Sequence, residues 1–233
     1  MARKQTLISL LNDLRAETRT SLNAAHNAQL RDTQVEHLQR AQEWFWNDFD
    51  WPHLLVERQV SLQAGQRFYE PPVDLLIDRV TRIEVRYGGV WIPLVAGIGG
   101  QQYAEFDSYL GRRSWPARRW RIYENEQIEI LPIPESNADV ATLEGVLKIE
   151  GIRNLNALAE DTERCDLDSR LIVLYAAAKL GAKDDGEAKM AEAMALYTDL
   201  RGKLMPRRRF RMMGSGQEVE YRPRRMTAIY IRS

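Results

Sequence analysis

Hydrophobic positions in the C-terminal third of the chain recur at the spacing of amphipathic helices. Apolar residues follow one another at intervals of three and four in two sets, Leu167, Leu171, Leu174 and Ala178, and then Met190, Ala193, Tyr197, Leu200 and Leu204. Each set draws one apolar stripe along a helix. Glycine and charged side chains at residues 181–186 interrupt the pattern. We therefore expect two helices in a hairpin, or one strongly kinked helix, over residues 166–204.

The ends of these helices carry capping signals. Asp166 or Asp168 can cap the first helix, because a short acceptor there satisfies amide donors that have no partner inside the helix. Asp184, followed three residues later by Glu187, forms a capping box for the second helix. Pro206 ends the helical pattern, so the hairpin should stop just before an arginine-rich segment.

The N-terminal region predicts two further helices. Residues 6–17 place four leucines on one helical face, whereas residues 21–31 are small and polar, as in a loop. A capping box from Thr33 to Glu36 opens a second helix, which ends near Pro52. The aromatic side chains at the end of this helix either belong to the core or anchor an interface. They are Trp44, Phe45, Trp46, Phe49 and Trp51.

Between residues 57 and 153 the period changes to two, which indicates strands. The expected strands cover residues 58–62, 67–70, 78–87, 90–94, 120–123, 127–133 and 143–153, and residues 101–111 suit a short helix. A turn at residues 64–66 should join the first two strands as a hairpin. Gly88 and Gly89 should join the next two, because paired glycines supply the backbone angles of a tight hairpin turn.

The order of these elements predicts an α+β fold. Residues 1–56 and 154–205 would supply the helices of one bundle, and residues 57–153 would form an inserted β-rich domain. Residues 206–233 would form an extended, arginine-rich C-terminal arm. The simplest packing sets the N-terminal helices against the hairpin, with the β domain projecting from the bundle.

Composition places the chain among globular proteins. Its 233 residues are 44% hydrophobic and 28% charged, which is enough for a sizeable core. Cys165 is the only cysteine, so no disulfide can form within the chain and a reducing compartment is expected. Residues 1–14 lack the pattern of a signal peptide, and no stretch approaches 18 consecutive apolar residues. We therefore expect no membrane partner.

Charge is unevenly distributed, although the formal net charge is zero. Residues 206–233 hold eight arginines, no lysine and two glutamates, so this arm carries a formal charge of +6 and the rest of the chain −6. A basic arm on an acidic body favours docking of the arm on an acidic surface. That surface could belong to a neighbouring copy, another protein or nucleic acid.

The candidate partner-binding residues lie in this arm and combine arginine with flexible apolar side chains. They are Arg207, Arg208, Arg209, Phe210, Arg211, Met212, Met213, Arg222, Arg224, Arg225, Ile229 and Ile231. Arginine forks suit carboxylates and aromatic faces at a protein interface as well as phosphates. Residues 226–231 suit a terminal strand that adds to another subunit's sheet. A nucleic-acid contact and a disordered solubilising tail are the alternatives.

Motifs for catalysis and cofactor binding are mostly absent. The glycines at residues 97–100 do not form a dinucleotide fingerprint, and the chain has neither a phosphate-binding loop nor a nucleophile elbow. His26, His37 and His53 lie on three elements, so we expect solvated or hydrogen-bonded roles for them. The acidic cluster at residues 160–168 could bind a divalent cation in a metal-dependent hydrolase, but helix capping explains it better. We expect no cofactor, no metal and no active site.

Three segments resemble the head–tail adaptor proteins of tailed bacteriophages, of the type called tail tubular protein A. They are the helix that closes in Trp44–Trp46 and Trp51–Pro52, the strand segment of residues 58–69 with Pro71 and Pro72 after it, and residues 167–178 with the helix and arm that follow. The resemblance implies a helical bundle with an inserted β domain. It also implies that the protein is a structural part of the virion.

The same resemblance implies how the protein would assemble. Twelve copies would form a ring beneath the portal protein, reached by the arm at residues 206–233. The β domain would face a tail nozzle or tail tube component, with DNA passing through the channel of the ring. We therefore expect a head–tail neck protein assembled in the cytoplasm of the bacterial host. The strongest alternative is a nucleic-acid-binding protein that uses the arm on phosphates.

Overall fold

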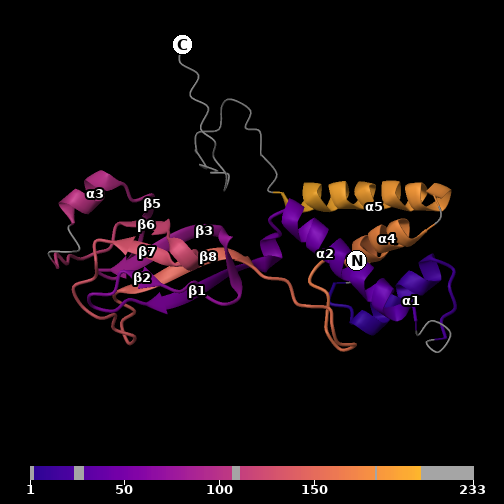
Figure 1. Cartoon of the computed structure of the whole chain (residues 1–233), viewed down its shortest axis with the longest axis horizontal. Coiled ribbons are helices and arrows are strands. Elements are labelled where there is room, and N and C mark those ends of the chain that lie inside the picture. Colours follow the sequence, from indigo (N-terminus) through magenta and orange to yellow (C-terminus); the bar gives the residue numbers. More distant parts are fainter. Residues whose placement is uncertain (1–2, 24–28, 107–110, 182, 206–233) are drawn as a thin grey trace, which may run out of the picture.

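Helices and strands gather into two units that lie side by side (Figure 1). The structure, a computed structural model, describes residues 3–23, 29–106, 111–181 and 183–205. Its helices are α1 (Leu7–Glu17), α2 (Arg31–Asp48), α3 (Gly100–Glu105), α4 (Ser169–Leu180) and α5 (Lys183–Leu204), with 3-10 turns at Pro52–Leu54 and Glu124–Glu126. Its strands are β1 (Leu55–Ser61), β2 (Phe68–Tyr69), β3 (Leu75–Tyr87), β4 (Val90–Pro93), β5 (Val95–Ala96), β6 (Arg119–Ile122), β7 (Ile128–Leu131) and β8 (Val146–Arg153).

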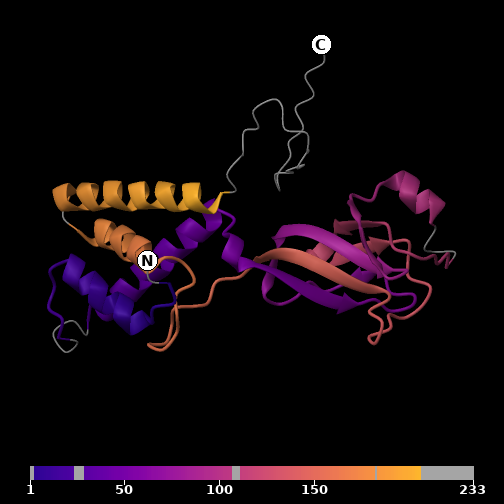
Figure 2. The same ribbon diagram turned by 180° about the vertical axis from the view of Figure 1, so that it is seen from behind.

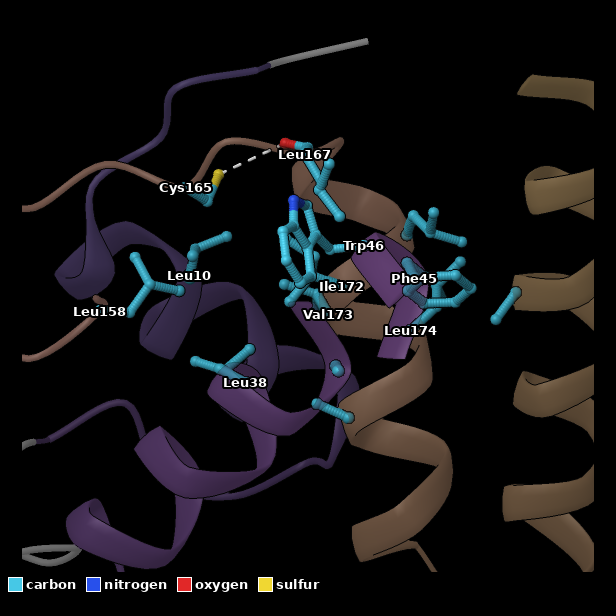
Figure 3. Packing of buried hydrophobic residues seen from close by; sticks show 14 of the residues in the cluster. Leu10, Leu38, Phe45, Trp46, Leu158, Cys165, Leu167, Ile172, Val173 and Leu174 are labelled. Carbon is cyan, nitrogen blue, oxygen red and sulfur yellow. Dashed lines mark hydrogen bonds between the residues drawn. The ribbon is translucent and has the colours of Figure 1, made fainter. Parts of the chain in front are cut away.

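The helical unit is built around α4, which contacts α1, α2 and α5. The expected stripe of α4 is buried at Leu167, Leu171 and Leu174, but so are Ile172 and Val173 beside it. Figure 3 shows Phe45 and Trp46 of α2 packed with the apolar side chains of α4. The expectation of a single apolar stripe was therefore too narrow, because α4 is enclosed by three other helices.

Helices α4 and α5 form the expected hairpin. The break falls at Gly181, and α5 runs along the outside of the helical unit, as Figures 1 and 2 show. Gly186 allows close approach of the two helices, because an added Cβ would lie 2.7 Å from the carbonyl oxygen of Ala178. Asp168 caps α4, with Oδ1 accepting from the Leu171 N–H at 3.2 Å. The second capping box is wrong, since α5 begins at Lys183 and Asp184 lies in its first turn.

Helix α2 starts earlier than its sequence signal indicated. Its N-cap is Leu30, which makes no side-chain capping bond, so the capping box at Thr33 and Glu36 is wrong. Thr33 and Glu36 instead lie inside the helix. Leu38 and Phe45 on its inner face are fully buried, and burial of these side chains outweighs the absence of a polar cap. The expected loop therefore ends one residue sooner, before Arg31.

The β unit contains two four-stranded sheets with the orders β1-β8-β3-β4 and β2-β7-β6-β5. The hairpin at Gly88 and Gly89 is confirmed, with Tyr87 opposite Val90. The other expected hairpin is wrong, because β1 pairs with β8 and β2 pairs with β7, in different sheets. The turn between them carries the chain from one sheet to the other. The short helix expected at residues 101–111 is present as α3, although residues 107–110 lie outside the described part.

Two hydrophobic cores correspond to the two units. The helical core joins α1, α2, α4 and α5, and it includes Cys165 and Ile152 from the end of β8. The β core lies between the two sheets and includes Ile83, Ile128 and Ile149. The chain enters the β unit once, at Leu55, and leaves it once, at Arg153. The α+β class with helices from both ends of the sequence is confirmed.

Candidate assembly interfaces

The twelve candidate residues of the arm all lie beyond Met205, outside the described residues. What the structure shows is the point from which the arm departs. The C-terminal end of α5 is fixed to the end of α2 by Asp48, which accepts hydrogen bonds from the Tyr197 hydroxyl and, at 3.2 Å, from Arg201 Nη1. Burial, followed by the hydrogen bond to Asp48, raises the pKa of Tyr197. The arm therefore starts beside the junction of the two units (Figure 1).

Aromatic side chains surround this point. Phe45 and Trp51 are fully buried and Trp46 is nearly so, as the core interpretation predicts. Trp44 differs, because it is 39% exposed and stacks on Tyr175 with ring centroids 5.3 Å apart. Of the five aromatics, Trp44 is thus exposed and Phe49 half-buried, and the Trp44 ring also lies 6.0 Å from that of Tyr197 in α5.

The junction is held by Arg79, which crosses from β3 to the C-terminal end of α2. Its Nη1 donates to the carbonyl of Trp46 at 2.6 Å and its Nη2 to that of Asn47 at 3.2 Å, and its guanidinium lies 4.3 Å from the centre of the Trp46 ring. Asp50 adds an ion pair at 3.3 Å. Arg79 lies within the first register shift of β3, between Leu75 and Val80, and such irregularities redirect side chains. Arg79 thus caps α2 from the other unit.

Asp166 forms a second contact across the junction. Its carboxylate binds Arg153 at the end of β8, with Nη1 at 3.2 Å from Oδ2, and accepts from the Asn156 N–H at 2.8 Å. Its carbonyl accepts from His53 Nε2 at 2.9 Å, and its own N–H donates to Gln42 of α2 at 3.2 Å. Burial is the main cause that lowers the pKa of His53. Asp166 therefore does not cap α4. It connects the helical unit to both segments that join it to the β unit, the one before β1 and the one after β8.

The acidic cluster at residues 160–168 does not converge on one point. Asp161 pairs with Arg31, Glu163 accepts from the N–H groups of Ala159 and Glu160, and Asp168 caps α4. No group of three potential metal ligands occurs among the residues with described positions. In the same residues, no helix is both long enough and apolar enough to cross a lipid bilayer. His26 lies outside the described residues.

A buried carboxylate in the β unit was not anticipated. Glu129 of β7 has no exposed surface, although it points away from the β core. It accepts hydrogen bonds from Arg67 Nε at 2.6 Å, Arg121 Nε at 2.5 Å and the Tyr103 hydroxyl of α3 at 2.8 Å. Burial alone would raise the pKa of Glu129, but the bonds from Arg121, Tyr103 and Arg67 outweigh it and hold the pKa below its ordinary value.

Both arginines of this cluster also contact aromatic rings. The Arg67 guanidinium lies 4.9 Å from the centre of the Tyr103 ring and 5.1 Å from that of Phe68. Arg121 lies 5.3 Å from Tyr103 and 5.2 Å from Tyr123. Tyr103 thereby fixes α3 to the sheet, even though α3 buries no residue. Alternation places Glu129 on the side of its strand that faces away from the β core, so no local pattern indicates this cluster.

Comparison with protein families identifies the chain as a structural adaptor of a bacteriophage. The matching model is that of the SU10 adaptor protein; it covers residues 6–224, and the chain belongs to this family. The protein is therefore a virion component whose partners lie among the portal and the tail, and the family is structural rather than enzymatic. No curated protein matches the chain.

Proposed function

We propose that twelve copies of the chain form a ring that joins the phage portal to the tail, and that residues 206–233 anchor each copy on the portal. The observation that carries this proposal is the extent of the family match, which continues past α5 to residue 224. Most of the arm, including Arg207 to Arg211 and Arg222, therefore belongs to the sequence that defines the adaptor family.

The described contacts support a role for the arm as an anchor. Asp48 fixes the end of α5 through Tyr197 and Arg201, so the arm starts from a rigid point. The arm carries a formal charge of +6 and the rest of the chain −6. A segment that becomes ordered only on binding loses conformational entropy at that step, which would keep free copies from assembling early. Ring closure needs a heterologous contact, to which opposite charges would contribute.

We assign the remaining parts of the chain within the same proposal. Residues 1–56 and 154–205 form the bundle domain, and residues 57–153 form a β domain that faces the tail nozzle or tail tube. DNA passes through the channel of the ring, and assembly takes place in the host cytoplasm before the virion is complete. The chain has no active site in this proposal, and its likeness to tail tubular protein A extends to its place in the neck.

The test is the mass of the chain, measured by light scattering alone and after mixing with the portal ring of the same phage. We expect the intact chain to be monomeric alone and to join the portal in ring stoichiometry. A chain truncated after Met205 should remain monomeric and fail to join.

A matched variant of the arm separates the geometry of its guanidinium groups from their positive charge. Replacing the seven arginines from Arg207 to Arg225 by lysine keeps the formal charge but removes the arginine forks. Specific docking on the portal should weaken at least tenfold in this variant. The contradicting result is an intact chain that does not bind the portal but binds DNA with a salt-dependent affinity, and a lysine variant that binds DNA equally well. The arm would then be a nucleic-acid site, and the proposal would be wrong.

A further inference from the structure

The edges of the two sheets differ greatly in length. Three of the four edge strands in the described part of the chain are short: β2 and β5 have two residues each, and β4 has four and contains Pro93. Strand β1 has seven residues and no proline. Figures 1 and 2 show it along one rim of the β unit. Proteins commonly keep edge strands short or interrupt them with proline, so a long open edge indicates a place where another strand pairs.

The backbone groups on this edge point outward at alternate residues. The carbonyl of Glu150 in β8 turns toward β3, where it accepts from Thr81 Oγ1 at 3.1 Å. Because bonding directions alternate along a strand, Ile149 then faces β1 and bonds its partner Arg58. Glu57, Gln59 and Ser61 therefore direct their N–H and C=O groups away from the sheet. An outward direction of the Glu57 carbonyl agrees with its hydrogen bond, because it accepts from the side chain of Arg58, at 2.9 Å from Nη1, and not from β8.

The side chains along this edge are amphipathic. Val56 and Val60 are only partly buried, where they extend the β core toward the rim. On the other face, Glu57 is exposed and stands directly opposite Glu150, a like-charge pair. Arg82 lies 3.5 Å from Glu150, whereas no ion pair of Glu57 occurs among the residues described. The edge thus offers outward backbone groups, a partly apolar side on which Arg58 pairs with Asp74, and on the other side the carboxylate of Glu57, which has no ion pair among the described residues.

We propose that residues 226–231 of a neighbouring copy add to this edge as an extra strand beside β1. This inference rests on the proposed ring. Ile229 and Ile231 alternate with Tyr230 and Arg232, so an extended segment here would set two isoleucines on the side of Val56 and Val60. The other face of the added strand would then lie on the side of Glu57, and Arg224 and Arg225, which precede the strand, would lie near its carboxylate. The 28 residues beyond Met205 supply both the terminal strand and a long basic connection to it.

A neighbouring copy is the occupant that the ring requires. In a heterologous contact, one patch of each copy binds a different patch of the next, and an open edge with a terminal strand is such a pair. This inference narrows the proposed portal anchor to the first part of the arm: residues 207–211 contact the portal, and residues 226–231 contact the next copy.

The test places a photo-reactive phenylalanine analogue at Tyr230 in the full chain and irradiates the complex with the portal. Copies labelled with ¹⁴N and ¹⁵N are mixed before assembly. We expect cross-links from residue 230 to residues 55–61 that join peptides of different isotope labels. Gln59→Pro removes an outward N–H that takes no part in the β1–β8 pairing, and should lower the yield of this cross-link at least tenfold. Glu57→Arg should lower it severalfold, whereas Glu43→Arg, the same charge change on the surface of α2, should not.

Each other outcome contradicts the inference. Cross-links only within one isotope label mean that the strand folds back on its own chain, and cross-links only to the portal mean that the whole arm binds there. Either result leaves the proposed adaptor function intact. If no complex with the portal forms, the proposed function is wrong, and the inference that rests on it is wrong as well.

Discussion

At the scale of single residues, Glu129 determines how the outer face of the second sheet is organised. It has no exposed surface, and its only described partners are two arginines and a tyrosine hydroxyl. Removing one member of a buried charged cluster leaves the others unpaired, which costs more than the cluster as a whole contributes. The stability of the β unit should therefore depend on this carboxylate.

Replacing Glu129 by glutamine should lower the free energy of unfolding by about 2–3 kcal/mol. This is below the cost for a fully buried pair, because Arg67 and Arg121 keep contact with water. Chemical denaturation measures the change. Glu135→Gln, at an exposed position of the same unit, is the control and should change stability by less than about 0.5 kcal/mol. Equal stability of the two variants would contradict the role assigned to Glu129.

The same residue predicts a dependence of stability on pH. The pKa of Glu129 is lowered in the folded state, so its contribution is complete above the ordinary glutamate pKa and is lost as the pH falls through the lowered value. Unfolding free energies measured from pH 7 down to pH 3 should fall less steeply below about pH 4.3 in Glu129→Gln than in the wild type. Parallel curves would show that the carboxylate is not held ionised by its partners.

At the scale of elements, Arg79 connects the two units by capping α2 from β3. Arg79→Ala should lower the free energy of unfolding by about 1.5–3 kcal/mol, the range for hydrogen bonds to charged groups. It should also increase the radius of gyration measured by small-angle X-ray scattering, because the junction would loosen. Arg79→Lys should be less destabilising than Arg79→Ala, since lysine keeps the positive charge but lacks the guanidinium that donates to two carbonyls.

The control for this prediction is Arg40→Ala on the same helix. Among the described residues, Arg40 pairs with Glu36 one turn away, and it is mostly exposed, so its loss should cost less than about 0.5 kcal/mol. If Arg79→Ala scatters and unfolds like Arg40→Ala, the junction does not depend on the cap.

Helices, caps and turns could be predicted from the sequence where neighbouring residues determine them. The leucine face of α1, the Asp168 cap and the hairpin at Gly88 depend on residues within a few positions of one another. The partner of β1 is β8, about ninety residues further along the chain, and no local pattern specifies such a pairing. The start of α2 was misplaced because burial of Leu38 and Phe45 counts for more than a capping box.

Candidate interface residues could likewise be found in the sequence only where they are close together along the chain. The arm stands out in the sequence because its charge is concentrated, and the family match extends to residue 224. Arg79, Asp166 and Glu129 do not stand out, since each gains its role from residues that are distant in sequence. Charged residues scattered along strands resemble solvent-facing positions until the fold brings them together.

At the scale of the whole molecule, the chain is an adaptor whose two units meet at one polar junction. Arg79 and Asp166 cross this junction, and the arm departs beside it from the end of α5. Identical copies can close a ring only if each holds the same angle between its contact surfaces. A fixed junction meets this requirement, and in the proposed ring a basic arm on an acidic body would provide contacts between neighbours.

The decisive quantity for a ring-forming adaptor is the number of adaptor chains bound to one portal ring. Native mass spectrometry of the purified complex gives this number without prior assumptions about its shape. We expect twelve copies of the full chain on each portal ring, and none of the chain that ends at Met205. A complex with one or a few copies, or equal binding of the truncated chain, would contradict a ring-forming adaptor anchored by its C-terminal arm.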